Sequence, residues 1–137
     1  MGVALDDYRP SDNEDFMSER QLAYFRRKLL DWKGEIKREA GETLAALQQQ
    51  NINHPDLADR ASSESDRSIE LRARDRQRKL IGKIDAALAR IEDGSYGYCE
   101  ESGEPIGWRR LDARPIATLS LEAQERHERR EKVYRDD

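Results

Sequence analysis

The sequence predicts a mainly α-helical protein in which a long antiparallel helical hairpin, or coiled coil, is followed by a small knuckle domain and a C-terminal helix. Charged residues make up 39% of the 137 residues and hydrophobic residues only 36%, which suits long solvated helices better than a large globular core. Apolar residues recur with helical spacing up to a Gly- and Pro-containing segment. We therefore expect an N-terminal arm at 1–17, a hairpin at 18–94 with its tip near 51–61, and the knuckle with the last helix at 95–137.

The first helix is predicted to begin at Ser18. Ser18 and Gln21 have the spacing of a capping box, in which the serine side chain and the glutamine side chain each satisfy a free backbone N–H group. Met17 is placed to pack on Leu22 as a hydrophobic staple. The arm before the cap shows no periodicity, so we expect residues 1–17 to be extended or mobile.

Both arms of the hairpin carry an apolar seam at spacings of three and four residues. The two seams are Leu22, Phe25, Leu29, Trp32 and Ile36, and Ile81, Ile84, Leu88 and Ile91. The asparagines and proline of 51–55 predict a break in the helix, with a second helix running from near Asp56 to Glu92. Folding about position 54 would place Ile84 near Tyr24 and Phe25, and Leu71 near Ile36.

The segment 95–137 is predicted to form a zinc-finger-like knuckle with one or two short strands, and Ser120 is predicted to cap a final helix through about Arg130. The positions of a four-cysteine zinc site are occupied by Cys99, Ser102, Ser120 and Ala123. Structural zinc requires four thiolate or imidazole ligands, which this set does not supply. We therefore expect no bound zinc, no required cofactor and a knuckle held by its aromatic side chains.

The charge balance and composition argue against DNA, a disulfide and a membrane as features of this protein. The chain has 25 Lys and Arg against 29 Asp and Glu, for a net charge of −4, which argues against a nonspecific or sequence-specific DNA binder. The single cysteine excludes an intrachain disulfide. We expect a cytoplasmic location and no membrane association, because neither a signal peptide pattern nor an apolar run of spanning length is present.

Five segments together resemble the DksA/TraR family with consistent spacing over about residues 16–133. They are Gln21–Arg27, Pro55–Ala61, Glu70–Leu80, Tyr96–Cys99 and Ile106–Pro115. The resemblance implies a transcription factor that binds bacterial RNA polymerase and catalyses no reaction. It departs from the family at the zinc site, where three of four cysteines are missing, and so is closest to zinc-independent family members.

The resemblance assigns roles to the hairpin. The tip residues Asp56, Asp59 and Ala61 would enter the secondary channel of the polymerase, and Arg72 and Arg76 would dock on its surface. Simpler interpretations stay open: the aspartates would stabilise a helix dipole. The arginine run 72–78 would be a solvated face paired with Glu35, Glu39 or Glu42 of the other helix.

The resemblance also implies that the alarmone ppGpp acts as effector, with Lys83, Arg114 and Leu80 as candidate contacts. Cations can hold phosphates where a hairpin meets a knuckle. Gln124 replaces a lysine expected on the last helix, and ordinary surface cations remain the alternative.

Two other classes of function remain at this point. A nucleic-acid-binding ribbon would use Trp108, Arg109, Arg110 and Arg114. A transcript-cleavage or elongation factor similar to the Gre factors would use the acidic tip. The leading expectation is a monomer that acts on the polymerase by binding some promoter complexes more tightly than others.

Overall fold

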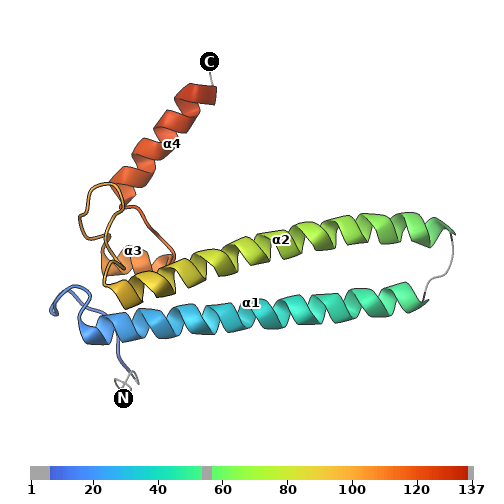
Figure 1. The fold of residues 1–137 in the computed structure, drawn as a ribbon, viewed down its shortest axis with the longest axis horizontal. Helices are drawn as coiled ribbons and strands as arrows, with labels where there is room; N and C mark the ends of the chain where they lie inside the picture. The colour runs from blue at the N-terminus through green and yellow to red at the C-terminus, as the bar shows by residue number, and fades with distance from the viewer. Residues whose placement is uncertain (1–6, 54–56, 136–137) are drawn as a thin grey trace. The chain divides into compact units, whose positions relative to one another are not determined.

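The computed structural model describes residues 7–53 and 57–135, and their regular structure is helical (Figure 1). The helices are α1 (Glu19–Asn53), α2 (Leu57–Asp93), α3 (Trp108–Ala113) and α4 (Leu121–Arg135). The mainly α-helical prediction is confirmed. Helix α1 continues through Asn51–Asn53, where a break was predicted, because asparagine only disfavours a helix interior by a fraction of a kcal/mol, about 0.7 at most.

The chain forms two compact units whose boundaries fall inside the long helices rather than near residue 94. The knuckle unit contains the described residues up to Leu29 and from Ala86 onward, and the hairpin unit contains residues 30–85. The start of α1 and the end of α2 thus belong with the knuckle. Packing explains this division, since Phe25 is fully buried and its ring pairs with that of Tyr96 at 5.8 Å between centroids.

Within the hairpin unit, α1 and α2 run antiparallel and side by side (Figure 1). Among the described residues of this unit, the buried hydrophobic side chains are Ile36 and Ile84. Lys33 Nζ lies 2.6 Å from Asp85 Oδ1, so the helices pair about position 59, midway between these residues, and not about 54. The predicted neighbour of Ile36, Leu71, is 63% exposed. Seam spacing alone does not specify how far one helix is offset along the other.

The start of α1 confirms the serine half of the predicted capping box, whereas the N–H of Ser18 itself donates to the carbonyl of Asp15 at 3.1 Å. The backbone N–H of Gln21 donates to Ser18 Oγ at 3.3 Å, and the backbone N–H of Met17 donates to Gln21 Oε1 at 2.9 Å. Gln21 is buried, so this exchange of hydrogen bonds also satisfies a polar side chain inside the unit. The helix therefore begins where the local sequence supplies partners for its free N–H groups.

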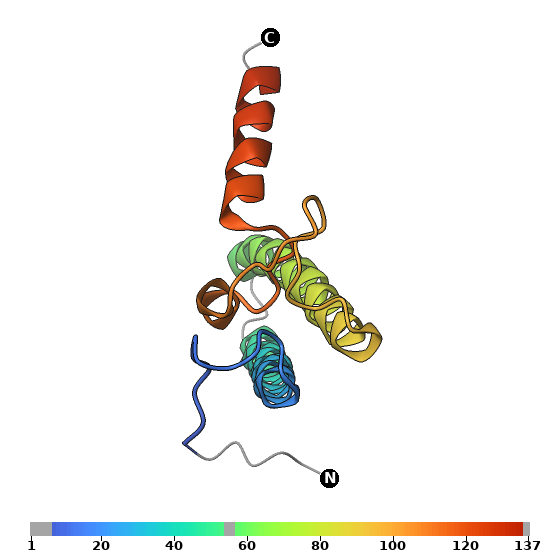
Figure 2. The same ribbon diagram turned by 90° about the vertical axis from the view of Figure 1, so that its left-hand side faces the viewer.

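The N-terminal segment 7–18 is an ordered part of the knuckle unit rather than a mobile arm (Figure 2). Tyr8 is buried, and its ring meets that of Tyr24 edge-on at 5.8 Å. The expectation of an extended or mobile arm is therefore wrong for residues 7–17, while residues 1–6 lie outside the described part of the chain. The contacts that hold the segment are to residues distant in sequence, which periodicity does not reveal.

The knuckle has turns where strands were predicted. In the described residues its one ladder contact is an isolated antiparallel bridge between Tyr98 and Pro105. A short helix, α3, was not predicted; it buries Leu111 completely. Gly97 has φ of 92°, and a Cβ there would lie 3.0 Å from the Met17 side chain, so this turn requires glycine. Met17 thus lies against Gly97.

Helix α3 is tied to α1 through Asp112. Tyr24 Oη donates to Asp112 Oδ1 at 2.6 Å, and Lys28 Nζ lies 2.7 Å from the same oxygen. Partial burial raises the pKa of Asp112, but the hydrogen bonds from Lys28 and Tyr24 lower it further than burial raises it. The carboxylate is therefore held in its charged form.

The final helix begins as predicted and runs further, to Arg135. Ser120 Oγ accepts the backbone N–H of Ala123 at 3.2 Å, the geometry of an N-cap. Only Ala123 is buried among the described side chains of α4, whereas Leu121 and Val133 are exposed. Helix α4 extends away from the turns of the knuckle (Figure 2).

Candidate functional site

The predicted tip residues lie at or beside the gap between the described ranges 7–53 and 57–135. Asp56 lies outside the described residues. Asp59 and Ala61 are the third and fifth residues of α2, and their side chains also lie outside the description. The backbone thus places Asp59 in the first turn of a long helix, where a carboxylate interacts favourably with the helix dipole. Its role at the polymerase stays a prediction.

A stripe along α2 brings four of the predicted site residues together. Ile69, Arg72, Arg76, Leu80 and Lys83 follow one another at spacings of three and four residues and so share one helix face. We call this set the α2 stripe. Its charged members are exposed and Ile69 is 64% exposed, so an apolar side chain and three cations face solvent together. Ile69 was not among the predicted site residues, although an isoleucine outside the apolar seam of α2 could have indicated an exposed apolar position.

The simpler interpretation of the arginine run is wrong in one respect. Arg74 pairs with Glu70 at 2.8 Å and Lys79 pairs with Asp75 at 3.1 Å, both within α2. In the described residues, no ion pair joins this run to Glu35, Glu39 or Glu42 of α1, and none includes Arg72 or Arg76. Spacing of four residues favours such pairs within one helix.

The candidate ppGpp residues are divided between the two units. Lys83 and Leu80 belong to the hairpin unit, whereas Arg114 follows α3 in the knuckle unit, so their convergence stays a prediction. Arg114 is exposed, and its backbone N–H donates to the carbonyl of Arg110 at 2.8 Å at the end of α3. Gln124 donates from Nε2 to Glu128 Oε1 at 3.3 Å on α4.

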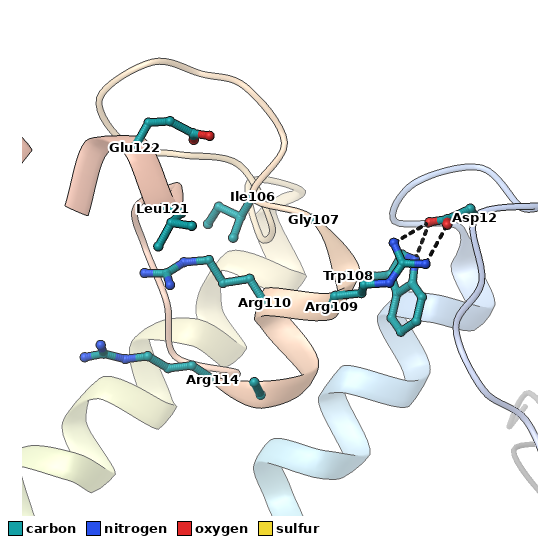
Figure 3. Close-up of a pocket in the computed structure, with 10 residues that line it drawn as sticks. Asp12, Ile106, Gly107, Trp108, Arg109, Arg110, Arg114, Leu121 and Glu122 are labelled. Atoms are coloured by element: carbon teal, nitrogen blue, oxygen red, sulfur yellow. Dashed lines mark hydrogen bonds and ion pairs between the residues drawn. The ribbon is translucent and has the colours of Figure 1, made fainter. Parts of the chain in front are cut away.

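The knuckle unit has a hollow of about 450 Å³ around α3, lined by arginine, carboxylate and apolar side chains (Figure 3). Its lining residues include Arg109, Arg110, Arg114, Trp108 and Leu121, with Asp12 at one end. Arg110 and Arg114 extend to the same side of α3, away from Asp12. Glu122 also lines the hollow, and Arg109 is paired with Asp12, so the charged groups around it are of both signs.

The structure does not support the alternative of a nucleic-acid-binding ribbon. The segment that carries Trp108, Arg109 and Arg110 is a helix. Trp108 Nε1 and Arg109 Nη2 each donate to Asp12 at 2.7 Å, and Arg110 Nε donates to the carbonyl of Leu119 at 3.0 Å. Three of the four proposed contact residues are thus engaged within the protein.

The turn that carries Cys99 is closed by backbone hydrogen bonds. The N–H of Cys99 donates to the carbonyl of Glu104 at 2.8 Å, and the N–H of Gly103 returns to the carbonyl of Cys99 at 2.9 Å. A further bond, from the N–H of Glu100 to the carbonyl of Thr118 at 2.9 Å, joins this turn to the segment before α4. The knuckle therefore keeps a closed turn without metal–ligand bonds.

Two serines stabilise the charged form of the cysteine. Cys99 is 3% exposed, and burial raises its pKa, but hydrogen bonds from the hydroxyls and backbone of Ser102 and Ser120 lower the pKa to about 6. Ser120 Oγ accepts the N–H of Ala123 and Ser102 Oγ accepts that of Glu104, so each hydroxyl keeps its proton for the sulfur. A thiolate here is satisfied by hydroxyl groups.

Comparison with known proteins identifies the family. The family model described as DnaK suppressor protein DksA, N-terminal domain, matches residues 21–91, and that of the prokaryotic dksA/traR C4-type zinc finger matches residues 94–129. The chain belongs to the DksA/TraR family. The predicted family is thus confirmed.

Relatives in this family match nearly the whole chain. The RNA polymerase-binding transcription factor DksA of Caulobacter vibrioides is 70% identical over 135 residues, covering 98% of this chain and 95% of the relative. That of Escherichia coli K12 is 44% identical, covering 95% and 86%. The solved structure of transcription factor DksA2 from Pseudomonas aeruginosa superposes with a TM-score of 0.80 at 43% identity, covering 88% of this chain and 94% of that one.

The family's zinc site does not fit this chain. The four ligand positions hold one thiol, two hydroxyls and the methyl group of Ala123. In the part of the chain that the structure describes, no group of three or more His, Cys, Asp and Glu side chains is placed to bind a metal. Structural zinc needs four such ligands, so the C4-type match is one of fold and not of ligand set.

Proposed function

We propose that the chain is a transcription factor that binds bacterial RNA polymerase directly and modulates transcription initiation. The observation that carries the proposal is the 70% identity, over almost the full length of both chains, to a relative named for this activity. Such similarity, spread across both units, supports a shared partner more strongly than a shared fold does. RNA polymerase is accordingly the proposed partner.

The proposed mode of action uses the hairpin. The α2 stripe provides an exposed isoleucine and three cations for docking, while the first turn of α2 brings Asp59 to the end of a narrow helical pair. A pair of helices can enter a channel that excludes a compact domain, and the secondary channel of the polymerase is the proposed destination. The tip would then favour some promoter complexes over others by differential binding, without catalysing a reaction.

The proposal also includes an effector, a cellular location and an oligomeric state. ppGpp is the proposed effector, with Lys83, Leu80 and Arg114 as its candidate contacts. We further propose a cytoplasmic monomer that does not bind DNA sequence-specifically. Among the described residues, no helix combines the length and the apolar character needed to span a membrane.

Purified core polymerase and transcription from a promoter with a short-lived open complex test the proposal. The wild-type chain should be retained by the polymerase and should change transcript yield, more strongly with ppGpp. Asp59→Asn should bind with similar affinity but lose regulation, whereas Glu64→Gln, an exposed carboxylate further along α2, should regulate normally. Absence of polymerase binding, or normal regulation by Asp59→Asn, would contradict the proposed mechanism.

A further inference from the structure

The knuckle unit is held together by contacts other than metal–ligand bonds. In a four-cysteine finger the metal joins two turns distant in sequence and so supplies much of the folding free energy. Here the corresponding turns are joined by a few hydrogen bonds around Cys99. The ordered segment 7–18, which we call the N-terminal clamp, contacts three separate parts of the same unit.

The first anchor of the clamp is on α1. The ring of Tyr8 lies under the guanidinium of Arg20, 4.4 Å from its Cζ, and edge-on to Tyr24. Tyr8 Oη donates to the carboxylate of Glu14 at 2.7 Å, and Glu14 also accepts the backbone N–H of Ser11 at 3.0 Å. These bonds fold the clamp on itself and fix one end of it to the helix.

The second anchor is on α3. Asp12 accepts hydrogen bonds from Trp108 Nε1 and from Arg109 Nη2, both at 2.7 Å, across 96 and 97 positions of sequence. The hydrogen bonds from Arg109 and Trp108 lower the pKa of Asp12. One carboxylate thus binds two donors of α3 at once (Figure 3).

The third anchor is on the turn that leads into Cys99. The ring of Phe16 meets that of Tyr98 edge-on at 5.5 Å. Met17 and Phe16 also lie against Gly97, at 3.0 Å and 3.3 Å from the position of a Cβ there. The clamp therefore covers the turn immediately before the first ligand position of the family's zinc site.

We propose that residues 7–18 take over the crosslinking role of the absent metal, holding α3 and the turn at Gly97–Tyr98 closed on the start of α1. Contacts across nearly a hundred positions restrict the chain much as a metal or a disulfide does, because each closes a long loop. The clamp's anchors are on three elements, so loss of one should loosen the knuckle without unfolding the helices. The proposal does not depend on polymerase binding.

Amide hydrogen exchange of the full-length protein tests the clamp. Asp12→Ala and Phe16→Ala each remove one anchor, and both should speed exchange severalfold at Cys99, Glu100 and Ile106, whose N–H groups close the knuckle. Asp15→Ala is the matched control, since the exposed side chain of Asp15 makes no hydrogen bond or ion pair with another described residue. Amides of α2 in the hairpin unit serve as the internal reference.

The outcomes separate the clamp from its alternatives. Faster exchange in both anchor variants, with wild-type rates in Asp15→Ala and in α2, supports the clamp. Unchanged knuckle rates in both anchor variants would overturn it, as would acceleration spread equally over α2. A chelator arm completes the test: if EDTA speeds knuckle exchange of the wild-type protein as much as Asp12→Ala does, a metal and not the clamp holds the knuckle closed.

Discussion

Removal of a single buried hydroxyl should show how the knuckle unit is stabilised. Tyr96 is 1% exposed, and its Oη donates to the carbonyl of Pro115 at 2.9 Å, joining the end of α2 to the segment after α3. Tyr96→Phe keeps the ring and its pairing with Phe25 but leaves that carbonyl without its partner. A lost hydrogen bond costs about 0.5–1.5 kcal/mol and an unpaired buried acceptor about 1–3 kcal/mol. We expect the free energy of unfolding to fall by about 1–2 kcal/mol.

Urea unfolding measured by tryptophan fluorescence provides the assay. Trp32 lies in the hairpin unit and Trp108 in the knuckle unit, so a Trp32→Phe background makes the signal specific to the knuckle. The midpoint should fall while the slope with urea stays constant, since a similar surface is exposed on unfolding. Tyr98→Phe is the control, because Tyr98 is 39% exposed. An unchanged midpoint in Tyr96→Phe, or an equal loss in Tyr98→Phe, would refute this account of the knuckle.

Three further predictions concern the ligand positions and the effector. The purified protein should contain no stoichiometric zinc by elemental analysis and keep its helicity in EDTA; about one zinc per chain would contradict this. The pKa of Cys99 is lowered to about 6 in the folded protein from about 8.5 in the unfolded chain. The Cys99 thiolate therefore stabilises the folded knuckle, fully above about pH 8.5, and this contribution is lost as the pH falls through 6. Cys99→Ala should therefore flatten the rise in unfolding free energy over that range, and a parallel pH profile would argue against a thiolate. Lys83→Ala or Arg114→Ala should reduce ppGpp-dependent regulation more than basal regulation, whereas equal losses would indicate a structural role.

The parts of the fold that depend on neighbouring residues were predictable from the sequence. Ser18 with Gln21 and Ser120 with Ala123 place the first turns of α1 and α4 because capping uses groups three positions apart. The apolar seams indicate the hairpin because residues three and four positions apart lie on one face of a helix. The family resemblance locates the knuckle.

Features that depend on distant contacts were missed. The offset of α1 along α2 depends on how the helices cross, and a pattern of apolar spacing is satisfied equally by several offsets. The clamp requires Asp12 to meet α3 across 96 positions, for which no periodic signal exists. Helix α3 spans only six residues, of which Leu111 is the buried one, so it is too short for periodicity to reveal.

Because few of the described side chains of the hairpin unit are buried, most of its positions can change in evolution with little effect on stability. Arg72, Arg76 and Lys83 are exposed, and substitutions at such sites usually alter stability by no more than about 0.5 kcal/mol. Selection can therefore change these side chains one at a time without passing through unstable intermediates. The same independence allows an experimenter to interpret lost activity in stripe variants as lost contact and not as misfolding.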